Sequence, residues 1–403
     1  MQQVFTGKRG HPVAQDARIT GLILSGGGAR AAYQVGVLMA LADLVPRGTR
    51  NPFPVICGTS AGAINAAALS ANAHNYRMAV RGLERVWANI TPEQVYRTDF
   101  WTFLKSIIKW SLSGVLTGDT PVHSALLDSE PLEKLLNLVI NFPRIQQAIE
   151  AGDLRALSIT ASSYATGESV AFFQGQENLE EWTRARRLGR KTRINAAHLL
   201  GSSAIPILFP AARVHDRYYG DGAVRQLAPV SPALHLGAER VLVVGVSGNA
   251  AHGRQREISG YPSLAQVLGH ILNSVFVDTL EADVERLERI NNTLHAIPAS
   301  TRRKQGIALR EVDVLKIYPS EPIDEIASRY IDRLPRTLRF FLRGSGATRS
   351  PGASAVSYLL FEPGFCRTLM SLGYRDAMAR EQEIRDFLEL PSSSAVPVAR
   401  SAS

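Results

Sequence analysis

Cysteine is scarce in this sequence, with two residues among 403. Two cysteines cannot form the disulfide framework of a small secreted protein, so that class is excluded and a reducing compartment fits. Cys57 lies inside a short apolar run and is expected to be a small buried core residue. No zinc-ligand spacing occurs, and we expect neither a metal ion nor another cofactor.

Long apolar segments are missing as well. The first 18 residues are polar and hold no apolar core of the kind found in secretory signals, so we expect a cytoplasmic protein without a signal peptide. The most apolar long window, residues 100–116, contains Lys105 and Lys109, and each lysine costs about 3 kcal/mol near the bilayer centre. It therefore predicts no transmembrane helix. Its pattern favours either an amphipathic segment at a lipid interface or over the active site, or an ordinary core helix.

Positive charge exceeds negative charge, with a formal net charge of +9. A positively charged protein can bind nucleic acid or an anionic membrane. The sequence contains no RNP-like aromatic run and no basic recognition helix, so nucleic acid is not an expected partner. Arg336, Arg339 and Arg343 share one face of a predicted helix in residues 333–344. We expect transient peripheral contact with an anionic membrane surface, and the sequence carries no signal of oligomeric state.

The stretch "FPVICGTSAGAINAAAL" runs from a short apolar strand into an alanine-rich helix through Gly58-Thr59-Ser60-Ala61-Gly62. A G-x-S-x-G at a strand-to-helix turn is typical of the nucleophile elbow, in which the flanking glycines permit a sharp turn and the serine hydroxyl stands clear of the sheet. We therefore predict Ser60 as a catalytic nucleophile. A plain glycine turn is the alternative.

An earlier strand leads into "SGGGARAA", where Gly26, Gly27 and Gly28 open a helix. These residues also satisfy the G-x-G-x-x-G/A pattern of dinucleotide-binding proteins. That motif needs an acidic residue about 20 positions further on, whereas Asp43 lies too early and inside the helical pattern. Serine acyl transfer instead needs backbone N–H groups aimed at a developing oxyanion, and glycines at a helix N-terminus can supply them. The triple glycine therefore predicts an oxyanion hole better than a turn that needs positive φ.

A proton acceptor for the serine is sought in the segment around "HDRYYGDGAVRQL". Two short β patterns flank His215-Asp216 like a hairpin, and Asp221-Gly222-Ala223 follows directly. An aspartate between two glycines is also common turn chemistry. From spacing alone, the base and the turn remain equally good interpretations of Asp221.

Four blocks in order resemble the patatin-like phospholipase family: "GGGARA", "GTSAG", "GSSAIP" at residues 201–206, and "DGA" at residues 221–223. The departures are Ala31 where many members have glycine, Gly201 where alanine is usual, and a final alanine in "DGA". The resemblance implies lipid acyl ester hydrolysis by a Ser60–Asp221 dyad. It also implies an oxyanion hole formed by Gly26, Gly27, Gly28 and their neighbours Ala29, Arg30 and Ala61, with Gly58, Gly62, Gly222 and Ala223 completing the motifs.

Alternating strand and helix patterns predict a layered α/β/α fold with a largely parallel central sheet over residues 19–246. Strands are expected near residues 19–25, 53–57, 155–161, 168–173, 211–219 and 240–246. A polar tail (1–18) precedes this catalytic domain. A linker or surface loop (247–262), a mainly helical C-terminal region (263–390) containing a strand in "VDVLKIYPS", and a disordered tail (391–403) follow it.

Two other functions stay open. An α/β-hydrolase esterase would need a histidine after the acid, and His235, His252 and His270 fit that order. However, no histidine precedes the glycine loop as in the HGGG-type motif, and each of the three is more consistent with a core or surface residue. A catalytically silent lipid-binding module would have no need of Ser60, Asp221 and three glycines together.

Overall fold

The computed structural model describes residues 18–97, 125–247, 264–307, 309–335, 339 and 353–391. Some predictions concern residues outside these ranges. They are the predictions for the amphipathic window 100–116, for Arg336 and Arg343, and for almost all of the N-terminal tail, the 247–262 linker and the C-terminal tail. In the described part of the chain, none of the helices has the length and apolar character needed to cross a bilayer.

A single mixed sheet runs through the described residues in the order β10-β9-β1-β2-β3-β4-β6-β5, and β8 pairs with both β3 and β7. The strands from β10 to β3 are parallel, whereas β4 and β8 run antiparallel to β3. The strands are β1 Thr20–Leu24, β2 Val55–Thr59, β3 Ala156–Ser163, β4 Ser169–Gly175, β5 Trp182–Arg184, β6 Arg187–Lys191, β7 Ala212–Val214, β8 Arg217–Asp221, β9 Arg240–Val244 and β10 Asp313–Ile317. The predicted α/β fold with a largely parallel sheet is confirmed.

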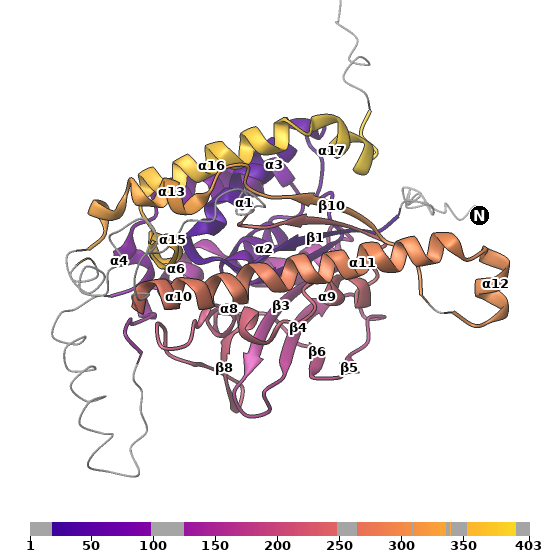
Figure 1. Cartoon of the computed structure of the whole chain (residues 1–403), viewed down its shortest axis with the longest axis horizontal. Coiled ribbons are helices and arrows are strands. Elements are labelled where there is room, and N and C mark those ends of the chain that lie inside the picture. The colour runs from indigo at the N-terminus through magenta and orange to yellow at the C-terminus, as the bar shows by residue number, and fades with distance from the viewer. Residues whose placement is uncertain are drawn as a thin grey trace, which may run out of the picture.

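Helices cover both faces of this sheet (Figure 1). The longer ones before β9 are α1 Ala32–Leu44, α2 Ala61–Ala71, α3 Tyr76–Asn89, α6 Glu130–Val139, α7 Pro143–Glu150 and α8 Ala196–Ser203, with the short α4 Pro92–Val95 and α9 Ser231–His235. Those after β9 are α10 Leu264–Asn273, α11 Thr279–Ala296, α12 Ala299–Lys304, α13 Ile323–Ser328, α15 Ala353–Leu359, α16 Pro363–Met378 and α17 Glu381–Phe387. The predicted helical C-terminal region is therefore present, and its strand β10 joins the same sheet.

The two faces of the sheet contribute to two hydrophobic cores because successive strand residues point in opposite directions. In β1, Leu22 and Leu24 belong to the larger core with α1, α2 and α16, whereas Ile23 belongs to the smaller core with α9 and α11. All three side chains are at most 3% exposed. Strands buried on both faces explain why the sequence shows continuous apolar runs there.

Helix α16 packs closely along α1, and Figure 1 shows it beside α1 and α3. A Cβ atom on Gly36 would lie 1.9 Å from the Met370 carbonyl oxygen, and one on Gly373 would lie 2.1 Å from that of Tyr33. Glycine is therefore required in both helices for their backbones to approach this closely. The C-terminal region is in this way packed directly against the helix that follows the glycine loop.

The strand predictions differ from the structure at the β5–β8 edge. The hairpin predicted around His215-Asp216 is confirmed: residues 211–219 contain the two strands β7 and β8, joined by a turn at His215, which has φ 54°. Strands β5 and β6 were not predicted, because "WTRARRLGRK" is rich in arginine rather than apolar. Charged residues are common on edge strands, where they protect the exposed backbone from unwanted pairing.

Candidate active site

Ser60 stands between the end of β2 and the start of α2 with φ 54° and ψ −130°. A positive φ is rare outside glycine, and such strained residues cluster at functional sites. The side chain is only 2% exposed. The strand–turn–helix context that defines a nucleophile elbow is therefore present at this serine.

The glycines on either side of Ser60 are required by close backbone approach. A Cβ atom on Gly58 would lie 2.5 Å from the Gly62 carbonyl oxygen, and one on Gly62 would lie 2.3 Å from that of Leu24. A side chain at Gly58 would collide with the backbone of α2, and one at Gly62 would collide with the end of β1. The turn therefore demands the G-x-S-x-G spacing.

The glycine-rich loop lies beside this turn because β1 and β2 are parallel neighbours, with Leu24 opposite Gly58. A Cβ atom on Gly26 would lie 3.1 Å from Ser60 Cβ, and Gly28, with φ 54°, lines the same pocket as Ser60. The amides of Gly27, Gly28 and Ala61 donate to no acceptor within the residues that the structure describes. Buried amides without an acceptor are rare in native proteins, so these are available to a substrate oxygen.

Ala29 and Arg30 continue from the glycines as the short 3₁₀ helix Gly28–Ala31. The Arg30 amide already donates to the Gly27 carbonyl oxygen at 3.1 Å. Its side chain is 2% exposed and extends into the C-terminal region, where it contacts Asp324 and Ser357. The predicted role of Arg30 in the oxyanion hole stays a prediction, while its side chain serves as a connection to the C-terminal helices.

Asp221 ends β8 and is fully buried. Strand β3 brings it to the serine, because Thr160 pairs with Thr59 of β2 and Ala161 pairs with Asp221. The Ala223 amide donates to Asp221 Oδ1 at 2.9 Å, whereas Oδ2 accepts no hydrogen bond of regular geometry from the described residues. Oδ1 is thus fixed by the Ala223 amide, while the Ser60 side chain is the other hydrogen-bonding group near this carboxylate.

Burial raises the pKa of Asp221 from its ordinary value of 3.8 to about 7. The Ser60 side chain and the Ala223 amide oppose this shift and lower the pKa, because both favour the charged carboxylate. A proton acceptor works best when its pKa lies near the operating pH. This aspartate therefore combines the position and the proton affinity that the sequence pattern alone left open.

Two polar residues that the sequence analysis gave no role hold the turn in place. The Ser202 hydroxyl accepts a hydrogen bond from the Ser60 amide at 2.9 Å and donates to the Thr160 carbonyl oxygen at 2.6 Å. Gln226 bonds with Thr59 Oγ1 at 2.8 Å and with Thr160 Oγ1 at 3.1 Å. The block "GSSAIP" was the sequence signal for Ser202, while no local signal marks Gln226.

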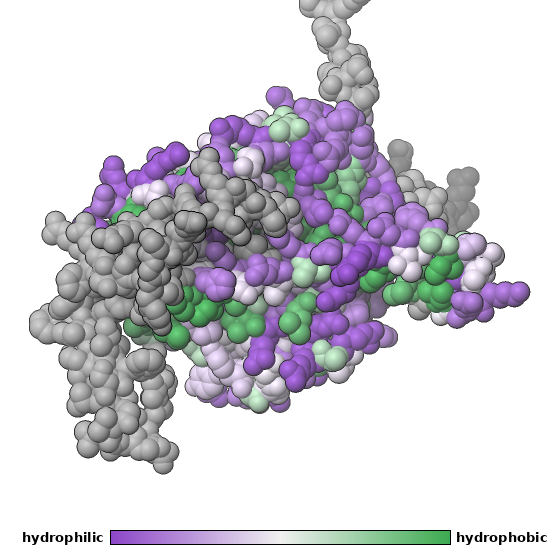
Figure 2. All heavy atoms as spheres, viewed as in Figure 1, coloured by the Kyte–Doolittle hydropathy of each residue, from purple (hydrophilic) through white to green (hydrophobic). Residues whose placement is uncertain are grey.

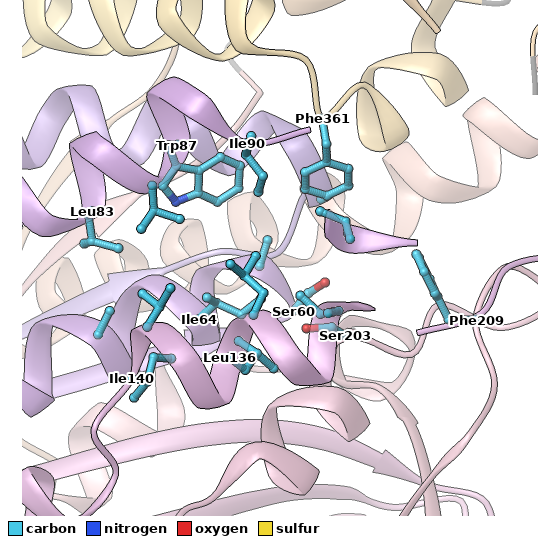
Figure 3. Close-up of a pocket in the computed structure, with 18 of the residues that line it drawn as sticks. Ser60, Ile64, Leu83, Trp87, Ile90, Leu136, Ile140, Ser203, Phe209 and Phe361 are labelled. Atoms are coloured by element: carbon cyan, nitrogen blue, oxygen red, sulfur yellow. The ribbon is translucent and has the colours of Figure 1, made fainter. Parts of the chain in front are cut away.

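An apolar pocket opens from Ser60 and encloses about 750 Å³ of empty space, including its solvent-open part. Aliphatic and aromatic side chains from α2, α3 and α6 form half of its wall. Figure 3 shows Ser60 next to Ser203, whose buried hydroxyl has no partner among the described residues. Small-molecule sites are commonly lined by such apolar side chains, with a few polar groups among them.

The candidate histidines do not gather at this pocket. His235 packs against Trp182 with 4.7 Å between the ring centroids, and His270 is exposed on α10. His252 lies outside the described residues. None of the histidines that the structure describes lines the pocket with Ser60. In the same described ranges, no three His, Cys, Asp or Glu side chains gather to form a metal site.

The sheet is mainly parallel and covered by helices, and a strained serine follows the carboxyl end of its second strand. The protein is therefore of the α/β/α class and has a nucleophile-elbow turn. A family model described as Patatin-like phospholipase matches residues 22–234, which is more than half of the chain. The chain therefore belongs to the patatin-like phospholipase family. Membership of this family supports a lipid hydrolase activity.

The solved structures that are similar to this chain include the following two. Human GIVD cytosolic phospholipase A2, in complex with the inhibitor methyl gamma-linolenyl fluorophosphonate and terbium chloride, matches 92% of this chain at 13% identity with a TM-score of 0.42, and the match spans 59% of that chain. VipD from Legionella pneumophila matches 91% of this chain at 13% identity with a TM-score of 0.35, over 67% of its own. No curated protein matches the sequence.

Proposed function

We propose that this protein is a lipid acyl hydrolase that cleaves carboxylic ester bonds with Ser60 as the nucleophile and Asp221 as the proton acceptor. One observation carries the proposal: a fully buried aspartate, whose pKa is raised to about 7 and which the Ser60 side chain hydrogen-bonds, accompanies a strained serine that lines an apolar pocket. Neither the strain nor the buried carboxylate is needed merely to fill a core.

In the first half of the reaction, Ser60 Oγ attacks the ester carbonyl carbon while its proton passes to Asp221 Oδ2. Negative charge gathers on the former carbonyl oxygen, where the amides of Gly27 and Gly28 donate to it. One such donor is worth about 3 kcal/mol in the transition state. As the tetrahedral intermediate collapses, the bond to the alcohol breaks and Asp221 returns the proton to the leaving oxygen. The acyl group remains bound to Ser60.

In the second half, a water molecule attacks the acyl carbon and gives its proton to Asp221. The same amides stabilise the second oxyanion. When the bond to Ser60 breaks, Asp221 returns the proton to Ser60 Oγ and the fatty acid leaves. Asp221 therefore serves alternately as base and acid, and a pKa near neutrality suits both roles.

A fluorophosphonate probe, followed by mass mapping, tests this proposal on purified protein. We expect labelling at Ser60 in the wild type and none in Ser60→Ala, with unchanged circular dichroism because one hydroxyl at a turn contributes little to stability. Labelling elsewhere, or ester hydrolysis by Ser60→Ala above a tenth of the wild-type rate, would contradict the assignment. A panel of position-labelled phospholipids, lysolipids and triacylglycerols then identifies the substrate class.

A Ser–Asp–His triad makes the opposite prediction for histidine. Replacing His235, His252 and His270 singly by glutamine should leave turnover within a small factor of wild type, because the proposal places no imidazole between Asp221 and Ser60. In a triad, one histidine would be as costly to lose as the serine itself. One folded His→Gln variant as inactive as Ser60→Ala would overturn the dyad.

Transient contact with an anionic membrane stays part of the proposal. Arg339, whose guanidinium donates to the Asp332 carbonyl oxygen, is the described member of the predicted arginine cluster. Figure 2 shows hydrophobic surface around α10, where Val267 and Ile271 are 41% and 52% exposed. Apolar contact of this kind adds to charge attraction at a lipid surface.

A further inference from the structure

Ser203 is the last residue of α8, and its two chain neighbours bond to the backbones of Ser60 and Asp221. On one side, the Ser202 hydroxyl accepts a hydrogen bond from the Ser60 amide at 2.9 Å. On the other side, the Ala204 carbonyl oxygen accepts one from the Asp221 amide at 2.8 Å. The backbone around Ser203 is therefore tied both to the serine and to the aspartate of the site, so its side chain has a fixed place beside them.

The side chain of Ser203 faces the apolar pocket. Ser203 lines this pocket together with Ser60, and Figure 3 shows the two side chains next to each other. The Ser203 hydroxyl oxygen is buried and has no hydrogen-bond partner among the residues that the structure describes, its own helix included. Buried hydroxyl groups are nearly always hydrogen-bonded in native proteins, so this one is available to a molecule in the pocket.

The other polar side chains of the described pocket wall already have partners. The Trp87 indole N–H and the Tyr358 hydroxyl each donate to an asparagine side chain, at 2.8 Å and 2.9 Å. The Ser60 side chain hydrogen-bonds Asp221. Within the described wall, Ser203 therefore carries the one polar side chain that is committed neither to the fold nor to Asp221.

The proposed reaction needs a polar group at such a place. The amides of Gly27 and Gly28 serve the former carbonyl oxygen, but the alcohol oxygen of the ester leaves beside Asp221, which returns the proton to it. The water of the second half approaches by the same path, because it gives its proton to the same carboxylate. A hydroxyl group suits both steps, since it can donate to the departing oxygen and accept from the second hydrogen of the water.

We propose that Ser203 is a further catalytic residue, which hydrogen-bonds the leaving alcohol oxygen during acylation and the attacking water during deacylation. Ser203 forms no covalent bond and keeps its own proton, because Asp221 carries the transferred one. The inference rests on the proposed function, since it assigns Ser203 to the ester that Ser60 attacks. A poor leaving group depends on such a donor more than a good one, because more negative charge gathers on its oxygen in the transition state.

Ser203→Ala tests this role in the full chain with the ethyl and p-nitrophenyl esters of one short fatty acid. For the ethyl ester, kcat/KM should fall about thirtyfold, because a donor to a developing charge is lost. For the p-nitrophenyl ester, kcat/KM should change less than about threefold, since nitrophenolate leaves without help, whereas kcat should fall about tenfold because it reports deacylation. A purely structural role would instead slow both esters by the same factor.

The matched control is Ser70→Ala. It removes another buried hydroxyl without a partner among the described residues, on α2 but outside the pocket wall, so both esters should react at the wild-type rates. Ser203→Thr keeps the hydroxyl and should retain both rates within about threefold, whereas Ser203→Cys, with a weak donor, should repeat the alanine pattern. Ser202→Ala, which releases the Ser60 amide, should slow both esters alike.

A selective loss for the ethyl ester that Ser203→Thr restores would support the assignment. Equal losses for both esters in Ser203→Ala and Ser203→Cys, or no loss for either ester, would overturn the role of Ser203 while leaving the hydrolase proposal intact. A wild type without Ser60-dependent hydrolysis of either ester would contradict the proposed function and this role with it.

Discussion

The Arg30 guanidinium forms an ion pair with Asp324 at 2.5 Å, across 294 residues of sequence. Arg30 also donates to Ser357 Oγ at 2.7 Å and lies 4.0 Å from the centre of the Tyr358 ring. The Tyr358 carbonyl oxygen in turn packs so closely on Gly28 that a Cβ atom there would lie 2.1 Å away. The C-terminal helices α13 and α15, which follow the matched family region, thus hold the glycine loop in position.

Replacing Arg30 by alanine should lower the free energy of unfolding by about 3 kcal/mol, because the charge-pairing and hydrogen-bonding partners of a buried guanidinium are left unmatched. Arg30→Lys should recover only part of this loss, since an ammonium group lacks the planar fork. Urea unfolding measures both variants. Ester hydrolysis should fall in parallel, because the loop that carries the oxyanion donors loses its anchor.

The exposed pair Arg375–Glu321, at 2.8 Å, provides the control for that experiment. Arg375 is 65% exposed, so Arg375→Ala should cost less than about 1 kcal/mol and leave hydrolysis unchanged. Equal losses of stability in the two alanine variants would show that the buried Arg30–Asp324 pair stabilises the fold no more than the exposed Arg375–Glu321 pair.

Turnover should depend on pH through Asp221. Burial raises the pKa of this carboxyl to about 7, and only the ionised form can accept the Ser60 proton. We therefore expect kcat to fall about tenfold per pH unit below pH 7 and to level off above it. Asp221→Asn, which keeps the shape and removes the acceptor, should lose activity at every pH. A profile that stays flat from pH 5 to pH 8 would exclude Asp221 as the titrating base.

The raised pKa of Asp221 also predicts that the free energy of unfolding falls as pH rises, whereas activity increases. Between pH 3.8 and about pH 7, the unfolded carboxyl ionises while the folded one stays protonated, so the stability contributed by Asp221 is lost as pH rises. A shift of about three units corresponds to an upper limit of about 4 kcal/mol. Asp221→Asn should therefore be more stable than wild type at pH 8, with the difference narrowing towards pH 4. Equal differences at both pH values in urea unfolding would refute this account.

Adjacent serines should respond differently to the same substitution. Ser202→Ala removes the hydrogen bonds to the Ser60 amide and the Thr160 carbonyl oxygen, and it should cost about 1–3 kcal/mol together with much of the activity. The Ser203 hydroxyl has no partner among the described residues, so Ser203→Ala should change stability by less than about 0.5 kcal/mol. Thermal unfolding of the pair measures the contrast. Similar losses in both would show that the Ser202 contacts do not hold the turn.

The sequence by itself determined the elements whose requirements are local. The apolar runs of β1, β2 and β9 predict buried parallel strands, and the G-x-S-x-G spacing predicts a sharp turn at Ser60. The contact that excludes a side chain at Gly58 is itself local, because it involves the Gly62 carbonyl oxygen four residues further on. The arginine-rich strands β5 and β6, of which β5 lies at the edge of the sheet, were not predicted because their residues form no apolar run.

Only the tertiary structure decided how Asp221 differs from an ordinary turn aspartate. Its complete burial and its raised pKa depend on β3 and β8 pairing beside the elbow, and sequence spacing contains no measure of burial. The contacts of Ser202, the Arg30–Asp324 pair and the wall of the pocket likewise join residues far apart in the chain. Such interactions arise from the packing of whole elements, and packing is fixed by the complete chain rather than by any local pattern.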